Sequence, residues 1–300
     1  MHLKLISALV ATSLGAAPVL AQELTGTLKK IKETGAVSLG HRESSVPFSY
    51  YDDRQQVVGY AMDLCARIVD RVKSELKLDK LETKLNPVTS ATRIPLMANG
   101  TIDLECGSTT NNLERQKQVA FTITHFVTAN RFVSKKSANL QTVDDLKGKT
   151  VVSTSGTTNI KQITEIGAQK GLNLNILAAK DHAEAFLMVE TGRAAAFVMD
   201  DILLYSLVAA AKSPKDYVIS TDALSVEPYG IMLRRDDPSF KKVVDEAMIA
   251  TYKSGAINPI YEKWFLKPIP PKGINLNVPV SDAFKKVIAS PTDSGDPAVY

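Results

Sequence analysis

Segments typical of β-strands and of α-helices alternate along almost the whole chain, and this alternation limits the possible folds more than any other feature. Short apolar runs such as 37–40 and 194–199 have the length of buried strands, whereas 60–72 and 240–253 carry apolar residues at helical spacing. Strands joined through helices normally run parallel, because the crossover needs a helix's length of chain. We therefore predict an α/β fold with mostly parallel sheets flanked by helices.

Residues 1–21 have the features of a signal peptide. His2 and Lys4 form a weakly basic start, residues 5–14 are apolar, and a small-residue cleavage site ends at Ala21. The apolar run is too short for a membrane-spanning helix. Roughly 280 residues would remain after cleavage, which at about 100–200 residues per domain indicates two domains. We predict an exported, periplasmic protein.

Charge and motif content argue against several classes of function. The formal net charge is only +4, and the basic residues are not concentrated in one tract, so the sequence gives little support for a nucleic-acid-binding role. The four histidines show no metal-ligand spacing, and no catalytic motif such as Gly-x-Ser-x-Gly is present. We predict a protein without metal, cofactor or catalytic residues.

Residues 105–115, with the sequence ECGSTTNNLER, follow a short predicted strand and turn at a glycine before three consecutive hydroxyls. Asn111 and Glu114 have the spacing of a capping box, which predicts a helix from residue 112 with Arg115 in its first turn. Free N–H groups, hydroxyls and a guanidinium then converge. The segment predicts a small-anion site, which fits a carboxylate as well as a phosphate.

Two further predicted strand ends carry polar clusters. Ser155-Gly156-Thr157-Thr158 repeats the pattern of strand, glycine turn and hydroxyls, and Asp200 follows a wholly apolar strand. The alternative is helix capping, which is the common role of such residues. Ligands of open α/β sheets bind beyond the carboxyl ends of the strands, so two facing sheets would bring these clusters together.

Two arginines and a histidine are weaker candidates. Arg42 follows the first predicted strand, and Arg93 lies three residues after Ser90, which is predicted to cap a short helix. A lone arginine is usually a solvated charge, but arginine also suits bidentate carboxylate recognition. His182 lies at a predicted helix start, where a surface or capping role is the alternative.

The chain has two cysteines, Cys65 and Cys106. In an exported protein they could form a disulfide. Cys65 falls in an apolar helical stretch and Cys106 at a strand end, so both could equally be small core residues. The spacing does not decide between these alternatives.

With these motifs in place, the chain resembles the periplasmic solute-binding proteins of the polar amino-acid uptake class, and within that class those that bind aspartate and glutamate. The similarity covers essentially the whole mature chain. The segments that carry it are 40–51, 105–112 with 114–117, 154–158, 179–182 and 197–201.

The resemblance implies a type II periplasmic binding protein fold with two α/β lobes. The first lobe would comprise residues 22–126 and 227–300, and the second lobe residues 127–226. Residues 126–130 and 225–229 would form the hinge.

The resemblance also implies how the α-carboxylate of a ligand would be held. Arg115, with Ser108 and Thr110, would clamp it from the first lobe. Thr158 and Thr157 would add hydroxyl or N–H donors from the second lobe.

The other two ligand charges would meet a second set of residues. Asp200 would bind the α-ammonium group, and Arg42, Ser90, Arg93 and His182 would surround the side-chain carboxylate. Phe48 could pack along the methylenes of the ligand, with a core position as the alternative.

The implied protein is a monomeric, non-enzymatic component of an ABC importer. It would trap L-glutamate or L-aspartate by hinge closure and deliver it to a permease in the inner membrane. One alternative is a dehydratase-like periplasmic enzyme on the same fold, acting on a carboxylic acid. A ligand module of a sensor is another.

Overall fold

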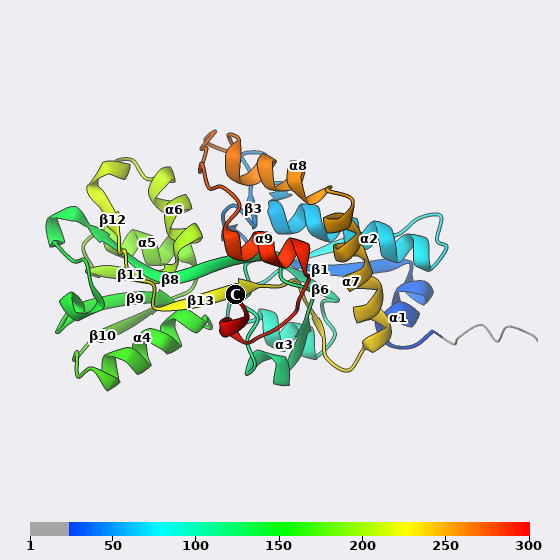
Figure 1. Cartoon of the computed structure of the whole chain (residues 1–300), viewed down its shortest axis with the longest axis horizontal. Helices are drawn as coiled ribbons and strands as arrows, with labels where there is room; N and C mark the ends of the chain where they lie inside the picture. The colour runs from blue at the N-terminus through cyan, green and yellow to red at the C-terminus, as the bar shows by residue number, and fades with distance from the viewer. Residues whose placement is uncertain (1–23) are drawn as a thin grey trace, which may run out of the picture.

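The structure, a computed structural model, describes residues 24–300 and consists of two lobes, each built on its own β-sheet (Figure 1). The predicted signal peptide at 1–21 and its cleavage after Ala21 lie outside the described residues. Within residues 24–300, no helix is both long and apolar enough to cross a membrane. The predicted two-lobed α/β class of fold is confirmed.

The first lobe contains a five-stranded sheet in the order β5-β1-β6-β14-β7. Strand β1 runs parallel to β5 and β6, whereas β14 runs antiparallel to β6 and β7. The chain therefore leaves this sheet after β7 and returns to it much later with β14. The strands are β1 (Ala36–His41), β5 (Glu82–Pro87), β6 (Leu104–Cys106), β7 (Val119–Phe121) and β14 (Met232–Arg234).

Helices and a small antiparallel sheet complete this lobe. Helix α2 buries Leu64, Ile68 and Val72 at helical spacing, so one of its faces joins the core. The helices are α1 (Gly26–Thr34), α2 (Tyr60–Glu75), α3 (Arg93–Ala98), α7 (Pro238–Lys253), α8 (Ile257–Tyr261) and α9 (Asp282–Ala289), with 3₁₀ turns at Arg115–Lys117 and Pro297–Val299 and a π-helical turn at Glu262–Leu266. The small sheet contains β2 (Ser44–Ser45), β3 (Ser49–Tyr51) and β4 (Val57–Val58).

The second lobe contains a sheet in the order β10-β9-β11-β8-β12, with β13 also paired to β8. Strand β9 runs parallel to β10 and β11, and every residue of β11 is buried, as expected for a central strand. The strands are β8 (Phe126–Lys135), β9 (Thr150–Thr154), β10 (Asn175–Ala179), β11 (Ala196–Asp200), β12 (Tyr217–Ile219) and β13 (Ser225–Tyr229). The helices are α4 (Thr158–Gln169), α5 (His182–Glu190) and α6 (Asp201–Ala210), with 3₁₀ turns at Lys136–Ala138, Val143–Leu146 and Pro214–Asp216.

Strands β8 and β13 run antiparallel between the two lobes, and α9 lies beside them (Figure 1). Their register pairs Asn130 with Ser225 and Phe126 with Tyr229. The far half of β8 continues into the six-stranded sheet, where it pairs with β11 and β12. The chain therefore crosses between the lobes along two hydrogen-bonded strands.

The helix predicted from residue 112 is wrong, and so is its capping box. Only a 3₁₀ turn forms, at Arg115–Lys117. The N–H of Arg115 donates to Asn112 Oδ1 at 2.8 Å, whereas the amide of Asn111 donates to the carbonyl of Asp293 at 2.8 Å. The side chain of Asn111, which was expected to cap the helix, thus bonds to the C-terminal segment.

Another local prediction also fails. Ser90 does not cap α3, which begins at Arg93; instead its hydroxyl accepts a hydrogen bond from Arg42. The C-terminal tail contains α9, whose N-cap Ser281 accepts from the N–H of Phe284. Because Phe284 is buried, this helix is anchored in the core.

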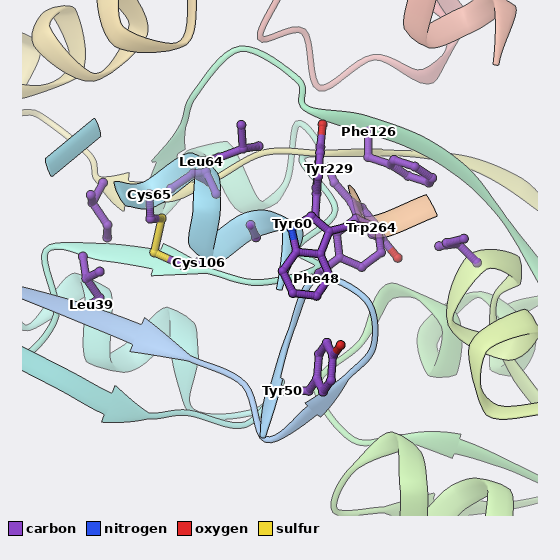
Figure 2. Packing of buried hydrophobic residues seen from close by; sticks show 14 of the residues in the cluster. Leu39, Phe48, Tyr50, Tyr60, Leu64, Cys65, Cys106, Phe126, Tyr229 and Trp264 are labelled. Carbon is purple, nitrogen blue, oxygen red and sulfur yellow. A yellow bond between two sulfur atoms is a disulfide. The ribbon is translucent and has the colours of Figure 1, made fainter. Parts of the chain in front are cut away.

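An aromatic cluster fills the first lobe next to the crossing strands (Figure 2). Phe48 lies at its centre and is fully buried, with ring centroids 5.1 Å from Phe126, 5.2 Å from Tyr229 and 6.0 Å from Tyr60. Edge-to-face packing of this kind stabilises beyond the area it buries. Phe48 is therefore a core residue, which was the alternative to ligand contact.

Cys65 of α2 and Cys106 of β6 form a disulfide, with Cα atoms 6.2 Å apart (Figure 2). Of the two alternatives left open by the sequence, the structure contains the pairing. The bond joins the main helix of the first lobe to the strand that leads directly into Ser108 and Thr110.

We expect the Cys65→Ala/Cys106→Ala double variant to be less stable. The disulfide closes a loop with a sequence separation of 41 residues, and closing a loop of that length restricts the unfolded chain by about 4 kcal/mol. Urea unfolding of the oxidised protein and of the variant measures this difference. Equal unfolding midpoints, or two free thiols in the untreated, unfolded protein, would contradict the prediction.

Candidate ligand-binding site

The predicted site residues lie where strands end at the facing edges of the two sheets. Ser108 and Thr110 follow β6, Thr157 and Thr158 follow β9, and Asp200 is the last residue of β11. The three strands β6, β9 and β11 therefore place these polar groups between the lobes, as the general rule for open α/β sheets requires. All ten predicted residues are buried except Thr158, which is half-buried: Arg42, Ser90, Arg93, Ser108, Thr110, Arg115, Thr157, His182 and Asp200 are the buried ones.

Arg42 and Arg93 lie close together on the first lobe. Arg42 Nη2 donates to Ser90 Oγ at 2.8 Å. Arg93 Nη1 donates to the carbonyl of Ser108 at 3.2 Å and to Thr109 Oγ1 at 2.5 Å. Burial, reinforced by the positive charge of Arg93, lowers the pKa of Arg42 to about 10. Two guanidinium groups at close range favour an anion between them.

A buried carboxylate balances one of these arginines. Glu105 is fully buried on β6 and accepts from Thr109 Oγ1 at 2.5 Å, while Arg93 Nη1 lies 3.8 Å from Glu105 Oε1. Arg93 therefore has an internal counter-charge. Within the described residues, Arg42 has no such ion pair, which leaves it as the stronger anion-binding group.

His182 begins α5 and faces the arginines from the second lobe. Its Nδ1 lies 2.8 Å from Thr154 Oγ1, and its Nε2 has no hydrogen-bond partner within residues 24–300. Burial lowers the pKa of His182 well below its usual 6.5, and the charges of Arg42 and then Arg93 lower it further. The ring is therefore neutral at pH 7. Asp181, directly before His182, caps α5 by accepting from the N–H of Glu184 at 2.9 Å.

Arg115 connects the lobes. Its Nη1 donates to the carbonyl of Thr110 at 2.8 Å and its Nη2 to the carbonyl of Gly156 at 3.2 Å. At the rim, Lys161 Nζ and Glu114 Oε2 form an exposed ion pair at 2.5 Å. The structure is thus a closed conformation, in which side chains of one lobe bond to the other.

Gly156 allows this close approach. Its φ is +76°, and an added Cβ would lie 2.5 Å from the Cα of Ala91 in the first lobe. No other residue fits here without moving the lobes apart.

Asp200 is held by two hydrogen bonds. Asn159 Nδ2 donates to its Oδ1 at 2.7 Å, and the hydroxyl of Tyr229 donates to its Oδ2. Burial, together with the negative charge of Glu227, raises the pKa of Asp200 to about 7. A cation bound beside Asp200 would offset both effects.

The two threonines at the start of α4 use their hydroxyl protons within the protein. Thr157 Oγ1 donates to the carbonyl of Thr154 at 2.7 Å and accepts from the N–H of Ile160 at 3.3 Å, so it caps the helix. Thr158 Oγ1 donates to Glu227 Oε2 at 3.0 Å. Among the described residues, the N–H groups of Thr158 and Asn159 in the first turn of α4 have no partner and remain as donors for an anion.

Several buried polar atoms between the lobes have no partner among the described residues. They are Arg42 Nη1, Arg93 Nε, Ser108 Oγ and His182 Nε2. A buried donor without an acceptor costs about 1–3 kcal/mol. Their concentration at one place, next to two arginines, is typical of a site that binds an anionic group.

Five residues around the site were missed from the sequence: Glu105, Thr109, Asn159, Glu227 and Tyr229. Glu105 and Thr109 lie within the segment 105–115 and could have been included. Glu227 and Tyr229 reach the site only because β13 crosses between the lobes, which no local pattern signals. Within residues 24–300, no group of three or more His, Cys, Asp or Glu side chains could hold a metal ion.

Comparison with known proteins agrees with this geometry. The chain is 55% identical over 290 residues to the L-glutamate/L-aspartate-binding protein of Pseudomonas aeruginosa, covering 96% of each chain. It is 48% identical over 267 residues to the glutamate/aspartate import solute-binding protein of Escherichia coli K12, covering 89% of this chain and 88% of that one. The solved structure of an ancestral arginine-binding protein bound to arginine superposes with a TM-score of 0.70 at 27% identity, covering 77% of this chain and 98% of that one.

Residues 37–267 match the family described as bacterial extracellular solute-binding proteins, family 3. This match spans both sheets and both crossing strands. The chain therefore belongs to the bacterial extracellular solute-binding proteins, family 3.

Proposed function

We propose that this protein captures L-glutamate or L-aspartate and delivers it to the permease of an ABC importer. The observation that carries the proposal is the charge pattern between the lobes. Arg42 Nη1 and His182 Nε2, which have no partner in the described part of the chain, lie on one side, and Arg115 with Asp200 on the other. The names of the relatives from P. aeruginosa and E. coli support the same ligands.

The three charges of an acidic amino acid have matching partners in this site. Arg115, Ser108 and Thr110 bind the α-carboxylate, and Asp200 binds the α-ammonium group. The N–H group of Thr158 adds a donor for the α-carboxylate, whereas Thr157, whose own N–H donates to the carbonyl of Thr154 at 3.4 Å, caps α4.

The side-chain carboxylate of the ligand completes the charge balance. It binds to Arg42, with Ser90, Arg93 and His182 around it. A neutral ligand such as glutamine would leave the buried charge of Arg42 uncompensated, which disfavours it.

The two lobes would close on the ligand by bending at the crossing strands β8 and β13. We assign residues 22–126 and 227–300 to the first lobe, residues 127–226 to the second, and the hinge to 126–130 and 225–229. The support is the register of β8 and β13, which pairs these two segments along their whole length. The bonds from Arg115 to Gly156 and from Lys161 to Glu114 would break on opening.

The cellular setting follows from this role. We propose that the mature protein is a monomer in the periplasm, released by cleavage after Ala21, that docks on an inner-membrane permease. The dehydratase-like alternative would need a general acid aimed at a leaving group. His182 is neutral and bonded to Thr154, so it offers no such acid at pH 7.

We expect Arg115→Ala to weaken L-glutamate binding by at least about 2 kcal/mol, roughly 30-fold, because it removes one partner of a buried charge contact. Titration calorimetry on the mature protein with L-glutamate, L-aspartate and L-glutamine measures this. Arg71→Ala, which removes an exposed arginine paired with Glu75 and Glu246, is the matched control and should bind normally. Tight glutamine binding without glutamate binding would refute the ligand assignment.

We expect Gly156→Ala to reduce affinity by at least about tenfold, because the added Cβ would collide with Ala91 and hold the lobes apart. Gly171→Ala is the control, since Gly171 has a φ of +62° with open space around it. Both variants should lose similar stability, but only Gly156→Ala should keep an open shape with ligand. Small-angle scattering with and without L-glutamate measures the shape, and normal closure of Gly156→Ala would contradict the mechanism.

Affinity for L-glutamate should fall as the pH is lowered through about 7, where Asp200 takes up a proton. The sign follows from charge: protonated Asp200 is neutral and attracts an ammonium group less, so binding releases a proton near this pH. Calorimetry between pH 5.5 and 8 in buffers of different ionisation enthalpy measures the proton count. Proton uptake across this range, even in a His182→Asn variant, would contradict the assignment.

A further inference from the structure

Glu227 is a buried carboxylate on β13 that the roles assigned above leave unused. Its side chain is only 1% exposed. Three uncharged groups donate to it: Thr158 Oγ1 at 3.0 Å, Gln162 Nε2 at 2.7 Å and the hydroxyl of Ser225. Within residues 24–300, no Lys or Arg forms an ion pair with it. A buried charge without a counter-ion normally has a functional reason.

Asp200 is also a buried carboxylate that forms no ion pair within residues 24–300. Its two oxygens accept from Asn159 and Tyr229, which are both neutral. The charge of Glu227 raises the pKa of Asp200, so the two carboxylates are close enough to repel each other. Arg115 interacts electrostatically with both carboxylates, but its Nη atoms already donate to carbonyl oxygens.

The region between Arg115 and β13 therefore carries an excess of negative charge in a buried setting. Besides Asp200 and Glu227, the charged or titratable groups facing it are Arg115, Tyr229 and Asp201, and Asp201 is itself paired with Arg131 Nε at 3.2 Å. One added positive charge offsets the repulsion between the two carboxylates. The α-ammonium group of an amino acid is such a charge, whereas a dicarboxylic acid without an amino group would add to the repulsion.

Thr158 extends this argument to hydrogen bonding. A hydroxyl has a single proton, and Thr158 donates it to Glu227. The oxygen of Thr158 can then only accept a hydrogen bond from the ligand. An ammonium group, which only donates, matches it. Glu227 thus turns a hydroxyl beside the site into an acceptor.

We propose that Glu227 is a specificity-determining residue, a second carboxylate behind Asp200 that restricts the site to dicarboxylates carrying an amino group. It acts through Asp200 and Thr158 without requiring contact with the ligand. The inference rests on the proposed function and specifies which acids the site excludes.

The test compares L-glutamate with glutarate, which has both carboxylates but no amino group. Calorimetry on the wild-type protein and on Glu227→Gln gives the dissociation constant of each ligand. We expect the ratio of the glutarate constant to the L-glutamate constant to fall at least tenfold in Glu227→Gln, with a weaker L-glutamate affinity. The pH at which L-glutamate affinity falls should also move downward, because removal of Glu227 lowers the pKa of Asp200.

Thr158→Val is the matched control, since it removes a hydrogen bond to Glu227 and keeps both carboxylates. It should weaken binding while leaving the pH dependence in place. A purely structural role for Glu227 predicts the opposite outcome: equal losses for both ligands in Glu227→Gln and an unchanged pH midpoint. That result would overturn the proposal.

Gln162→Lys is a second variant that tests the proposal if Glu227→Gln does not fold. It places a cation beside Glu227 without removing the carboxylate, and the same loss of discrimination is expected. An unchanged ratio in this variant would also overturn the proposal. The wild-type affinity for L-glutamate is a separate readout, because its absence would refute the proposed function whatever the variants show.

Discussion

The antiparallel pairing of β8 with β13 is the interaction on which the rest of the molecule depends. The largest buried apolar cluster contains residues of both lobes, and the chain passes between the two sheets along these two strands. Their backbone hydrogen bonds hold the two sheets next to each other. In this arrangement Arg115 of the first lobe lies within bonding distance of Gly156 of the second.

The site between the lobes combines two kinds of polar group. Some side chains are already satisfied by the protein and act as fixed structure, such as Thr157 at the cap of α4. Others, such as Arg42 and His182, keep an atom that has no partner among residues 24–300. The first kind maintains the shape of the site and the second kind supplies the free energy of binding, since a ligand group satisfies a donor that is already desolvated.

Residues could be assigned a role from the sequence where that role depends on their local pattern. The assignment failed where a side chain bonds to a segment far away in the chain. Ser108 and Asp200 could be singled out because each lies where a predicted strand ends. Asn111 was misassigned because its amide bonds to Asp293, which lies far away in the chain. Glu227 was missed for the same reason: its partners Thr158 and Gln162 lie on another element, and nothing near residue 227 indicates them.

The disulfide between α2 and β6 makes the stability of this protein depend on its compartment. In the reducing cytoplasm both thiols stay free, and the chain lacks the restriction that the bond places on its unfolded state. Because Cys106 lies two residues before Ser108 in the segment that builds the candidate anion site, the disulfide also restrains that segment, and it does so only where thiols are oxidised.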